Sequence, residues 1–196
     1  MPSSQCTTKA LTSLALVLSP LQISQVQAAV ELDQRYLGGL WREDGYQREV
    51  TSPNSLVVGI MNSEQNQLIG LGCCWHILDE AHITLLLIAA DYRGLGLGKQ
   101  LLITLLKDAV NRGLERATLE VRESNNVAIA LYQKLGFTMA GKRPGYYQDP
   151  PECALIFWRK ELNTPAFSEL LDNCECLNHG RLKAAHVVFT IKGLLN

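Results

Sequence analysis

The residues best suited to chemistry form a glycine-rich segment at positions 91–99. Its three glycines, Gly94, Gly96 and Gly98, stand between an apolar strand-like run and a long segment with helical apolar spacing. A turn of this kind presents unpaired backbone N–H groups at the beginning of a helix, and these groups attract anions such as phosphate. Glycine also lets a ligand approach the backbone closely. The segment therefore predicts a phosphate-binding loop.

Two common kinds of phosphate loop do not fit this spacing. A Walker A loop has four residues between its first glycine and a Gly-Lys-Ser/Thr run, but Gly94 is one residue too close and Gln100 follows Lys99. A dinucleotide loop has the pattern GxGxxG, but its last position falls on Lys99 or on Leu101. Glu120 stands roughly where a dinucleotide loop needs its ribose-binding acid, so that alternative stays open. A glycine turn without a ligand is the other alternative.

The elements that position the loop follow from apolar spacing. Residues 56–61, 68–78 and 82–89 predict three strands of an antiparallel meander, with turn-forming residues between them. Helical spacing then begins near Gly96 and ends at Gly113. The further predictions are strands at 14–18, 117–121, 137–140 and 154–158, and helices from 19 onward, at 41–50 and at 127–135. This predicts a mixed α/β sheet in the order β-α-α-β-β-β-α-β-α-β-β, within a domain spanning 13–162.

The first thirty residues permit two interpretations. They contain no acidic residue, and an apolar run followed by Val-Gln-Ala at 26–28 imitates a targeting segment. A strand followed by a helix explains more residues, because Ser19 suits the N-cap, Pro20 the first helical position and Gln22 a capping box. Ile23, Val26 and Val30 then share one helical face. We expect a flexible tail at 1–12 and leave a targeting role for it open.

Charge and hydropathy exclude two classes of partner. The 196 residues carry 18 Lys and Arg against 19 Asp and Glu, and this balance gives no basic surface for nucleic acid. No apolar run reaches the roughly 18 residues that a membrane-spanning helix needs. We therefore expect neither nucleic acid nor a membrane as a partner.

Cysteine spacing favours a reducing compartment, and hence the cytoplasm. The six cysteines form neither a disulfide framework nor a paired CxxC zinc site. The tail run Cys174-Glu175-Cys176, followed by His179 and His186, places its cysteines closer together than zinc sites normally do. We expect no metal, and residues 163–196 read as an appendage whose packing is not predictable.

Four segments resemble the motifs of one superfamily. Arg93-x-x-Gly96-x-Gly98 resembles the R/Q-x-x-G-x-G/A signature of the GNAT acetyltransferases. Residues 119–126 and 128–137 resemble its LEVRxSN and AxxLYxxxGF motifs, and 143–147 resembles a later R-x-x-Y-Y. Over about residues 14–162 the sequence is similar to this superfamily, most of all to its ribosomal-protein alanine N-acetyltransferase (RimI) type. Residues 86–90 and 150–153 depart from the family pattern, and the second departure lies on the substrate side.

The resemblance implies acetyl-CoA as cosubstrate. Backbone groups of the glycine loop would hold its pyrophosphate, and those of a strand before the loop its pantetheine arm and thioester carbonyl. The strand ending near Ala89 and the strand at 117–121 should part to admit it. The residues expected at the cofactor are Leu86, Leu87, Ile88, Arg93, Gly94, Leu95, Gly96, Leu97, Gly98, Lys99, Asn125 and Tyr132.

The resemblance also implies the catalytic residues, Glu120 as general base and Tyr132 as general acid. Independently of it, a carboxylate at a strand end can accept a proton from an amine, directly or through water, and a phenol can protonate a leaving thiolate. Taken alone, Glu120 would be interpreted as a solvated strand-end charge and Tyr132 as a core residue of its helix; the joint motif reverses that interpretation. Tyr146 and Tyr147 are expected to flank the acceptor peptide, or to be aromatic residues of a strand edge.

The pKa of the acceptor amine helps to choose between possible acceptor groups. At pH 7 an α-amine is about 10% neutral, whereas about one lysine in 2,500 is neutral, a difference of roughly 3 kcal/mol. A single glutamate base without an obvious helper therefore favours an N-terminal amine, and the resemblance implies the N-terminal alanine of a small-subunit ribosomal protein. The alternatives are a lysine or small-amine acetyltransferase and a non-catalytic CoA-binding module.

Overall fold

The computed structural model describes residues 13–194, so the tail expected at 1–12 lies outside the described part of the chain. The predicted element order is confirmed, with one more helix and one more strand after it. The strands are β1 (Leu14–Pro20), β2 (Ser55–Asn62), β3 (Gln67–Ile77), β4 (Glu80–Ile88), β5 (Arg116–Arg122), β6 (Thr138–Gln148), β7 (Pro151–Lys160) and β8 (Val187–Ile191). The helices are α1 (Val26–Leu37), α2 (Glu43–Thr51), α3 (Leu97–Asn111), α4 (Asn126–Lys134) and α5 (Pro165–Ala184), with short 3-10 turns at Ile23–Gln25 and Ala90–Tyr92.

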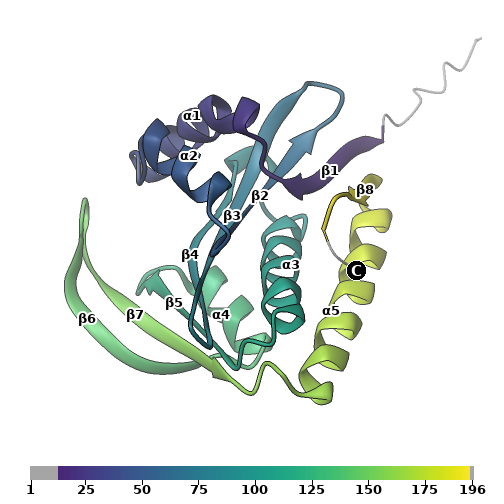
Figure 1. Cartoon of the computed structure of the whole chain (residues 1–196). Helices are drawn as coiled ribbons and strands as arrows, with labels where there is room; N and C mark the ends of the chain where they lie inside the picture. The colour runs from purple at the N-terminus through teal and green to yellow at the C-terminus, as the bar shows by residue number, and fades with distance from the viewer. Residues whose placement is uncertain (1–12, 195–196) are drawn as a thin grey trace, which may run out of the picture.

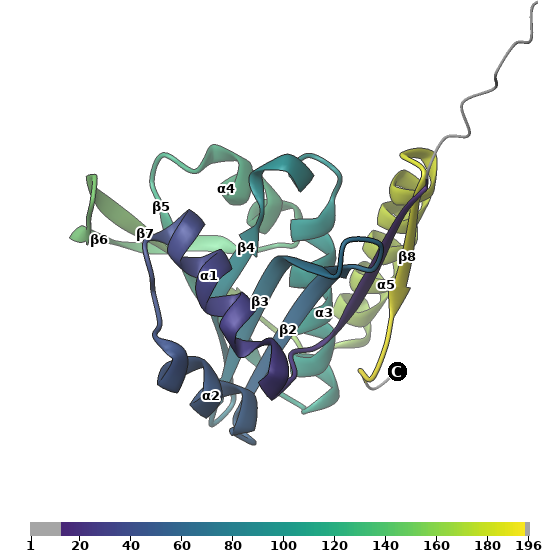
Figure 2. The same cartoon turned by 90° about the horizontal axis from the view of Figure 1, so that it is seen from above.

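All eight strands form one mixed sheet in the order β6-β7-β5-β4-β3-β2-β1-β8. The predicted antiparallel meander of β2, β3 and β4 is confirmed, and β4 pairs with β5 in parallel. Helices α1 and α2 cover one face of the sheet, and α3 covers the other (Figure 1). Figure 2 shows α5 and β8 together at the far end of the sheet from β6. No helix in residues 13–194 is long and apolar enough to cross a membrane.

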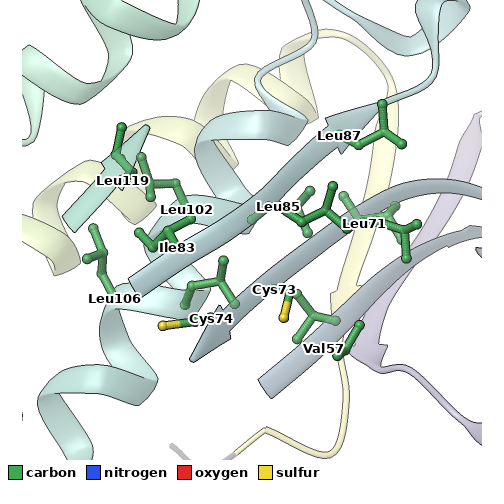
Figure 3. Packing of buried hydrophobic residues seen from close by; sticks show 14 of the residues in the cluster. Val57, Leu71, Cys73, Cys74, Ile83, Leu85, Leu87, Leu102, Leu106 and Leu119 are labelled. Atoms are coloured by element: carbon green, nitrogen blue, oxygen red, sulfur yellow. The ribbon is translucent and has the colours of Figure 1, made fainter. Parts of the chain in front are cut away.

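The core is continuous across the sheet because both faces are buried. Leu102 and Leu106 of α3 pack beside Ile83, Cys74 and Leu119 from three neighbouring strands (Figure 3). Cys73 and Cys74 are adjacent on β3 and therefore point to opposite faces, and both are fully buried. Burial raises the pKa of the Cys73 thiol to about 11, so this thiol stays protonated and unreactive.

The predicted helix start at Ser19 is wrong. Strand β1 continues through Pro20, because Ser19 and Pro20 pair with β2 and Leu21 N then donates to Val57 O at 2.9 Å. The helical turn begins only after Gln22, whose N–H donates to Gln25 Oε1 at 2.9 Å. Ile23 is 52% exposed, so it does not share the buried face on which Val26 lies. Because β1 continues to pair with β2 through Pro20, Ser19 does not become the N-cap of a helix.

Two other boundaries differ from the predicted ones. Helix α2 begins at Glu43 rather than at residue 41. Strand β6, whose beginning was predicted at 137–140, extends to Gln148 and includes Pro144 and Gly145. Strand β6 is an edge strand with a register irregularity between Arg143 and Tyr147, and an edge strand tolerates proline because one side of its backbone needs no partner.

A buried carboxylate organises the connection between α1 and α2. Asp33 is fully buried and accepts hydrogen bonds from Leu40 N and Trp41 N, both at 2.9 Å, and from the Tyr46 hydroxyl at 3.0 Å. These bonds satisfy loop N–H groups and explain why the helix starts after Trp41. Asp33 thereby fixes the position of Trp41, whose ring stacks on Trp75 at 6.2 Å.

Asp33→Ala should lower the free energy of unfolding by about 3 kcal/mol, because three buried donors lose their charged acceptor. Tyr46→Phe is the matched control, since it removes only one of the three bonds and should cost about 1.5 kcal/mol. Urea unfolding of both variants measures the difference. Equal losses in the two variants would mean that the two backbone bonds contribute nothing.

The appendage after residue 162 packs as a part of the sheet domain. Thr164 is the N-cap of helix α5, its side chain accepts from Phe167 N, and Pro165 lies in the first turn. Strand β8 pairs in parallel with β1, with Leu14 opposite Val187 and Leu18 opposite Ile191. Helix α5 lies along α3, the helix that follows the glycine loop (Figure 1).

Candidate active site

Strands β4 and β5 part as the sequence predicted. Their parallel pairing runs only from Glu80 opposite Arg116 to Ile83 opposite Leu119, and no later residue of β4 pairs with β5 in the described chain. The register between β3 and β4 shifts at the same place, where Cys73 faces Leu85 but Cys74 faces Ile83. This β-bulge bends β4 at the beginning of the opening. Glu120 is the first residue of β5 after the last one that pairs with β4.

The open edge of β4 offers backbone groups to a ligand. Ala89 N donates to Ile69 O on β3 at 2.8 Å, and alternate residues of an antiparallel strand point the same way. Leu87 therefore directs its backbone toward β3, whereas Leu86 and Ile88 direct theirs toward the opening. Of the three residues predicted to hold the pantetheine arm by their backbone, Leu86 and Ile88 are placed to do so and Leu87 is not.

The glycine loop lies at the end of β4 and caps α3. Gly94 and Gly96 have φ values of +81° and +96°, in the left-handed region that favours glycine, and Gly96 is the N-cap of α3. The N–H groups of Gly94 to Lys99 donate to no other atom of residues 13–194. Six neighbouring donors at a helix N-terminus are suited to an anion with several oxygens, such as a pyrophosphate.

Arg93 anchors the loop to the strand that precedes it. Its Nε donates to Ile88 O at 3.0 Å, and its guanidinium lies 5.7 Å from the centre of the Tyr36 ring. Arg93 therefore fixes the position of the loop through its side chain, while the expected anion donors are backbone groups.

Glu120 is held between two basic side chains. Its carboxylate oxygens lie 2.9 Å from His82 Nε2 and 3.5 Å from Arg143 Nη1, and its side chain is 16% exposed. The hydrogen bond with His82, then the charges of His82 and Arg143, hold the pKa of Glu120 below its ordinary value, although burial opposes the shift. Glu120 is therefore ionised at neutral pH.

The premise that Glu120 has no helper is thus wrong. His82 lies opposite Thr118 in the parallel register, so it shares a face with Glu120, two residues further along β5. Behind His82 the Trp75 ring packs edge-on at 5.9 Å, and Trp75 Nε1 donates to Glu49 at 2.7 Å. The imidazole that contacts Glu120 is consequently held by packing from behind.

Tyr132 places a protonated phenol in the interior. The residue is 6% exposed and packs against Phe137 and Phe157, with ring centres 6.0 and 6.3 Å away. Burial, and secondarily Tyr147, raises its pKa well above the ordinary value. Its hydroxyl has no hydrogen-bond partner in residues 13–194 and is not sealed from solvent. The phenol is therefore free to donate to a ligand.

Tyr147 links the two predicted catalytic residues. Burial is the main cause of its raised pKa, and the Glu120 carboxylate contributes to the shift, as Tyr147 itself does at Tyr132. Tyr147 is held by the Arg122 guanidinium, 4.1 Å from its ring centre, and by Tyr146 at 5.0 Å. Tyr147 therefore lies within electrostatic reach of both Glu120 and Tyr132.

A family model described as the acetyltransferase (GNAT) family matches residues 26–137, more than half of the chain. The chain belongs to the GNAT family. As a member of that family it is an acetyl-CoA-dependent N-acetyltransferase, and the fold expected from the resemblance is confirmed.

Relatives of this GNAT enzyme match most of its length and nearly all of theirs. The putative ribosomal protein bS18-alanine N-acetyltransferase of Bacillus subtilis (strain 168) is 30% identical over 138 residues, 70% of this chain and 91% of that protein. The ribosomal protein bS18-alanine N-acetyltransferase of Escherichia coli (strain K12) is 31% identical over 141 residues, which cover 71% of this chain and 93% of that protein. The crystal structure of the Escherichia coli ribosomal-protein-S18-alanine N-acetyltransferase has a TM-score of 0.67 at 30% identity, covering 74% of this chain and 94% of that one.

Asn125 of this GNAT enzyme has a structural task that its motif did not reveal. It is the N-cap of α4, and its Oδ1 accepts from Ala128 N at 3.2 Å. The side-chain oxygen is therefore engaged in the cap, and only the amide Nδ2 remains for the cofactor contact that the resemblance implies.

Proposed function

We propose that this GNAT enzyme acetylates the N-terminal α-amine of a protein, and that its acceptor is the N-terminal alanine of a small-subunit ribosomal protein. The observation that carries the proposal is the ionised Glu120 at the opening between β4 and β5, together with a protonated Tyr132 whose hydroxyl has no hydrogen-bond partner among the described residues. The Bacillus subtilis and Escherichia coli relatives, each matched over more than nine-tenths of its length, are named as ribosomal protein bS18-alanine N-acetyltransferases, the first as a putative one, and this supports the acceptor.

The cofactor contacts follow from the free backbone groups. The N–H groups of residues 94–99 hold the pyrophosphate of acetyl-CoA, and the open edge of β4 aligns the pantetheine arm through Leu86 and through the N–H of Ile88, since the Ile88 carbonyl already accepts from Arg93. The Asn125 amide contributes a further donor. Held in this way, the thioester would lie at the opening between β4 and β5, where Glu120 and Tyr132 would act on it.

Glu120 acts on the attacking amine. At neutral pH the acceptor α-amine is mostly protonated, and the ionised Glu120 carboxylate takes its proton, directly or through water, so that a neutral nitrogen attacks the thioester carbon. His82 and Arg143 keep the carboxylate oriented and ionised. Tyr146 and Tyr147 flank the peptide that carries the amine.

Tyr132 acts on the leaving sulfur. Its raised pKa keeps the phenol protonated throughout the neutral range, so it always offers a donor to the thiolate. Burial that disfavours a phenolate also disfavours a bare thiolate, which therefore gains proton affinity in the same pocket. The reaction ends with the acetyl group on nitrogen and the proton on sulfur.

Thiol release from acetyl-CoA with a panel of peptides tests the proposal. An alanine-starting peptide with one internal lysine should release thiol, and the same peptide with a blocked α-amine should lose at least about 100-fold of the rate, as the difference in neutral amine predicts. Retention of the rate by the blocked peptide would identify a lysine acetyltransferase. Acetyl-CoA binding without release for any acceptor would identify a non-catalytic module.

The cytoplasm is the proposed location. The five cysteines that the structure describes are all free, and this pattern fits a reducing compartment: Cys73, Cys74, Cys153, Cys174 and Cys176. A ribosomal acceptor would meet the enzyme in the same compartment.

A further inference from the structure

Helix α5 contacts the glycine loop from behind through two polar side chains. Arg181 Nη2 donates to Gly94 O at 2.6 Å, and Asn178 Nδ2 donates to Gly96 O at 3.2 Å. The acceptors are the carbonyls of the two left-handed glycines of the loop. Both donors belong to the segment after residue 162 and lie outside residues 26–137, which the family model matches.

The contact is part of a buried polar network. Asn178 is 3% exposed and Gln100 is fully buried, and Asn178 Nδ2 also donates to Gln100 Oε1 at 3.0 Å. Gln100 Nε2 then donates to Glu175 Oε1 at 2.8 Å, and Glu175 Oε2 pairs with Lys107 at 2.6 Å. Buried amides are costly unless their bonds are made, so this network fixes how α5 is oriented toward the loop.

Holding these carbonyls also orients the donors of the loop. In a planar trans peptide the carbonyl and the following N–H point in opposite directions. When Gly94 O and Gly96 O point toward α5, the N–H groups of Leu95 and Leu97 point to the opposite side, where an anion would bind. The contact is close, because a Cβ on Gly96 would lie 2.5 Å from Asn178 Oδ1.

We propose that Asn178 and Arg181 are positioning residues of the acetyl-CoA site, which hold the loop so that its N–H groups face the pyrophosphate before the cofactor binds. This inference rests on the proposed binding of the pyrophosphate by the loop. The ordering of the loop then does not have to be driven by the cofactor, which binds more tightly as a result.

Arg181→Ala should raise KM for acetyl-CoA about tenfold, the effect of losing one hydrogen bond from a charged group. The change in kcat should be less than about twofold, because Arg181 touches no reacting atom. Asn178→Ala should act in the same direction. Lys183→Ala is the matched control, since it removes an exposed positive charge from the same turn of α5 without a loop contact and should leave KM unchanged.

A thioester without phosphates separates positioning from structural damage. S-acetyl-pantetheine lacks the pyrophosphate, so wild type and Arg181→Ala should turn it over at equal rates. Arg181 is exposed and its variant should fold, which thermal unfolding checks. An unchanged KM for acetyl-CoA in folded Arg181→Ala, or an equal loss with S-acetyl-pantetheine, would overturn the inference. Failure of the wild type to bind acetyl-CoA would overturn the proposed function as well.

Discussion

Glu120→Gln should lower kcat by roughly 10²–10⁴ and leave the affinity for acetyl-CoA almost unchanged. The amide cannot accept the proton of the attacking amine, while the contacts that hold the cofactor lie elsewhere, on β4 and in the glycine loop. Steady-state kinetics with an alanine-starting peptide measures both quantities. Glu123→Gln is the matched control, because Glu123 is half exposed, pairs with Lys142 and should tolerate the same exchange without loss.

The pH dependence distinguishes a base from a positioning group. The pKa of Glu120 is lowered from an ordinary value of about 4.3, so the carboxylate is ionised throughout the neutral range. Its titration therefore causes no change in the pH–rate profile near pH 7. The rise in rate toward pH 8 comes from the acceptor amine, whose pKa is about 8. The loss caused by Glu120→Gln should therefore shrink above pH 8. A loss independent of pH would assign Glu120 to peptide binding.

Tyr132→Phe should lower kcat by about 10²-fold or more, because the leaving thiolate loses its proton donor. The loss should stay constant between pH 6 and 9, since the raised pKa keeps the phenol protonated across that range. Paired pH–rate profiles of wild type and variant measure it. The variant should fold with nearly unchanged stability, because the hydroxyl has no hydrogen-bond partner in the described chain.

Two results would contradict that role of Tyr132. A kcat within threefold of wild type would mean that the thiolate leaves without help from the phenol. A large loss accompanied by a fall in unfolding free energy of more than about 1 kcal/mol would mean that the hydroxyl supports the core instead. Phe137 and Phe157, which pack against the ring, would then be the residues to examine.

Features that depend on the conformation or spacing of neighbouring residues were predictable from the sequence. Gly96 is needed where a left-handed residue begins a helix, and apolar spacing located α3 directly behind it. The parting of β4 and β5 and the order of eleven elements followed from the same spacing and from the family resemblance. Ser19 shows where local spacing is insufficient. It is a residue type that caps helices, but it pairs with β2 and continues strand β1 instead.

Contacts between distant segments were not predictable. His82 lies 38 residues before Glu120, and only the parallel register of β4 and β5 brings them together. Arg181 lies 87 residues after Gly94, in a segment whose packing could not be placed at all. Histidine and arginine are common surface residues, so neither position carried a signal of its own. The basic partners of Glu120 and the support behind the glycine loop emerge only from tertiary structure.

Mapping the site of acetylation tests the central claim most directly. An alanine-starting peptide from a small-subunit ribosomal protein, with a free α-amine and one internal lysine, is incubated with enzyme and acetyl-CoA and analysed by fragmentation mass spectrometry. The mechanism predicts one acetyl group, on the α-nitrogen of alanine, and none after Glu120→Gln at pH 7 over the same time. Acetyl on the lysine side chain, or an unmodified peptide with the wild-type enzyme, would contradict it.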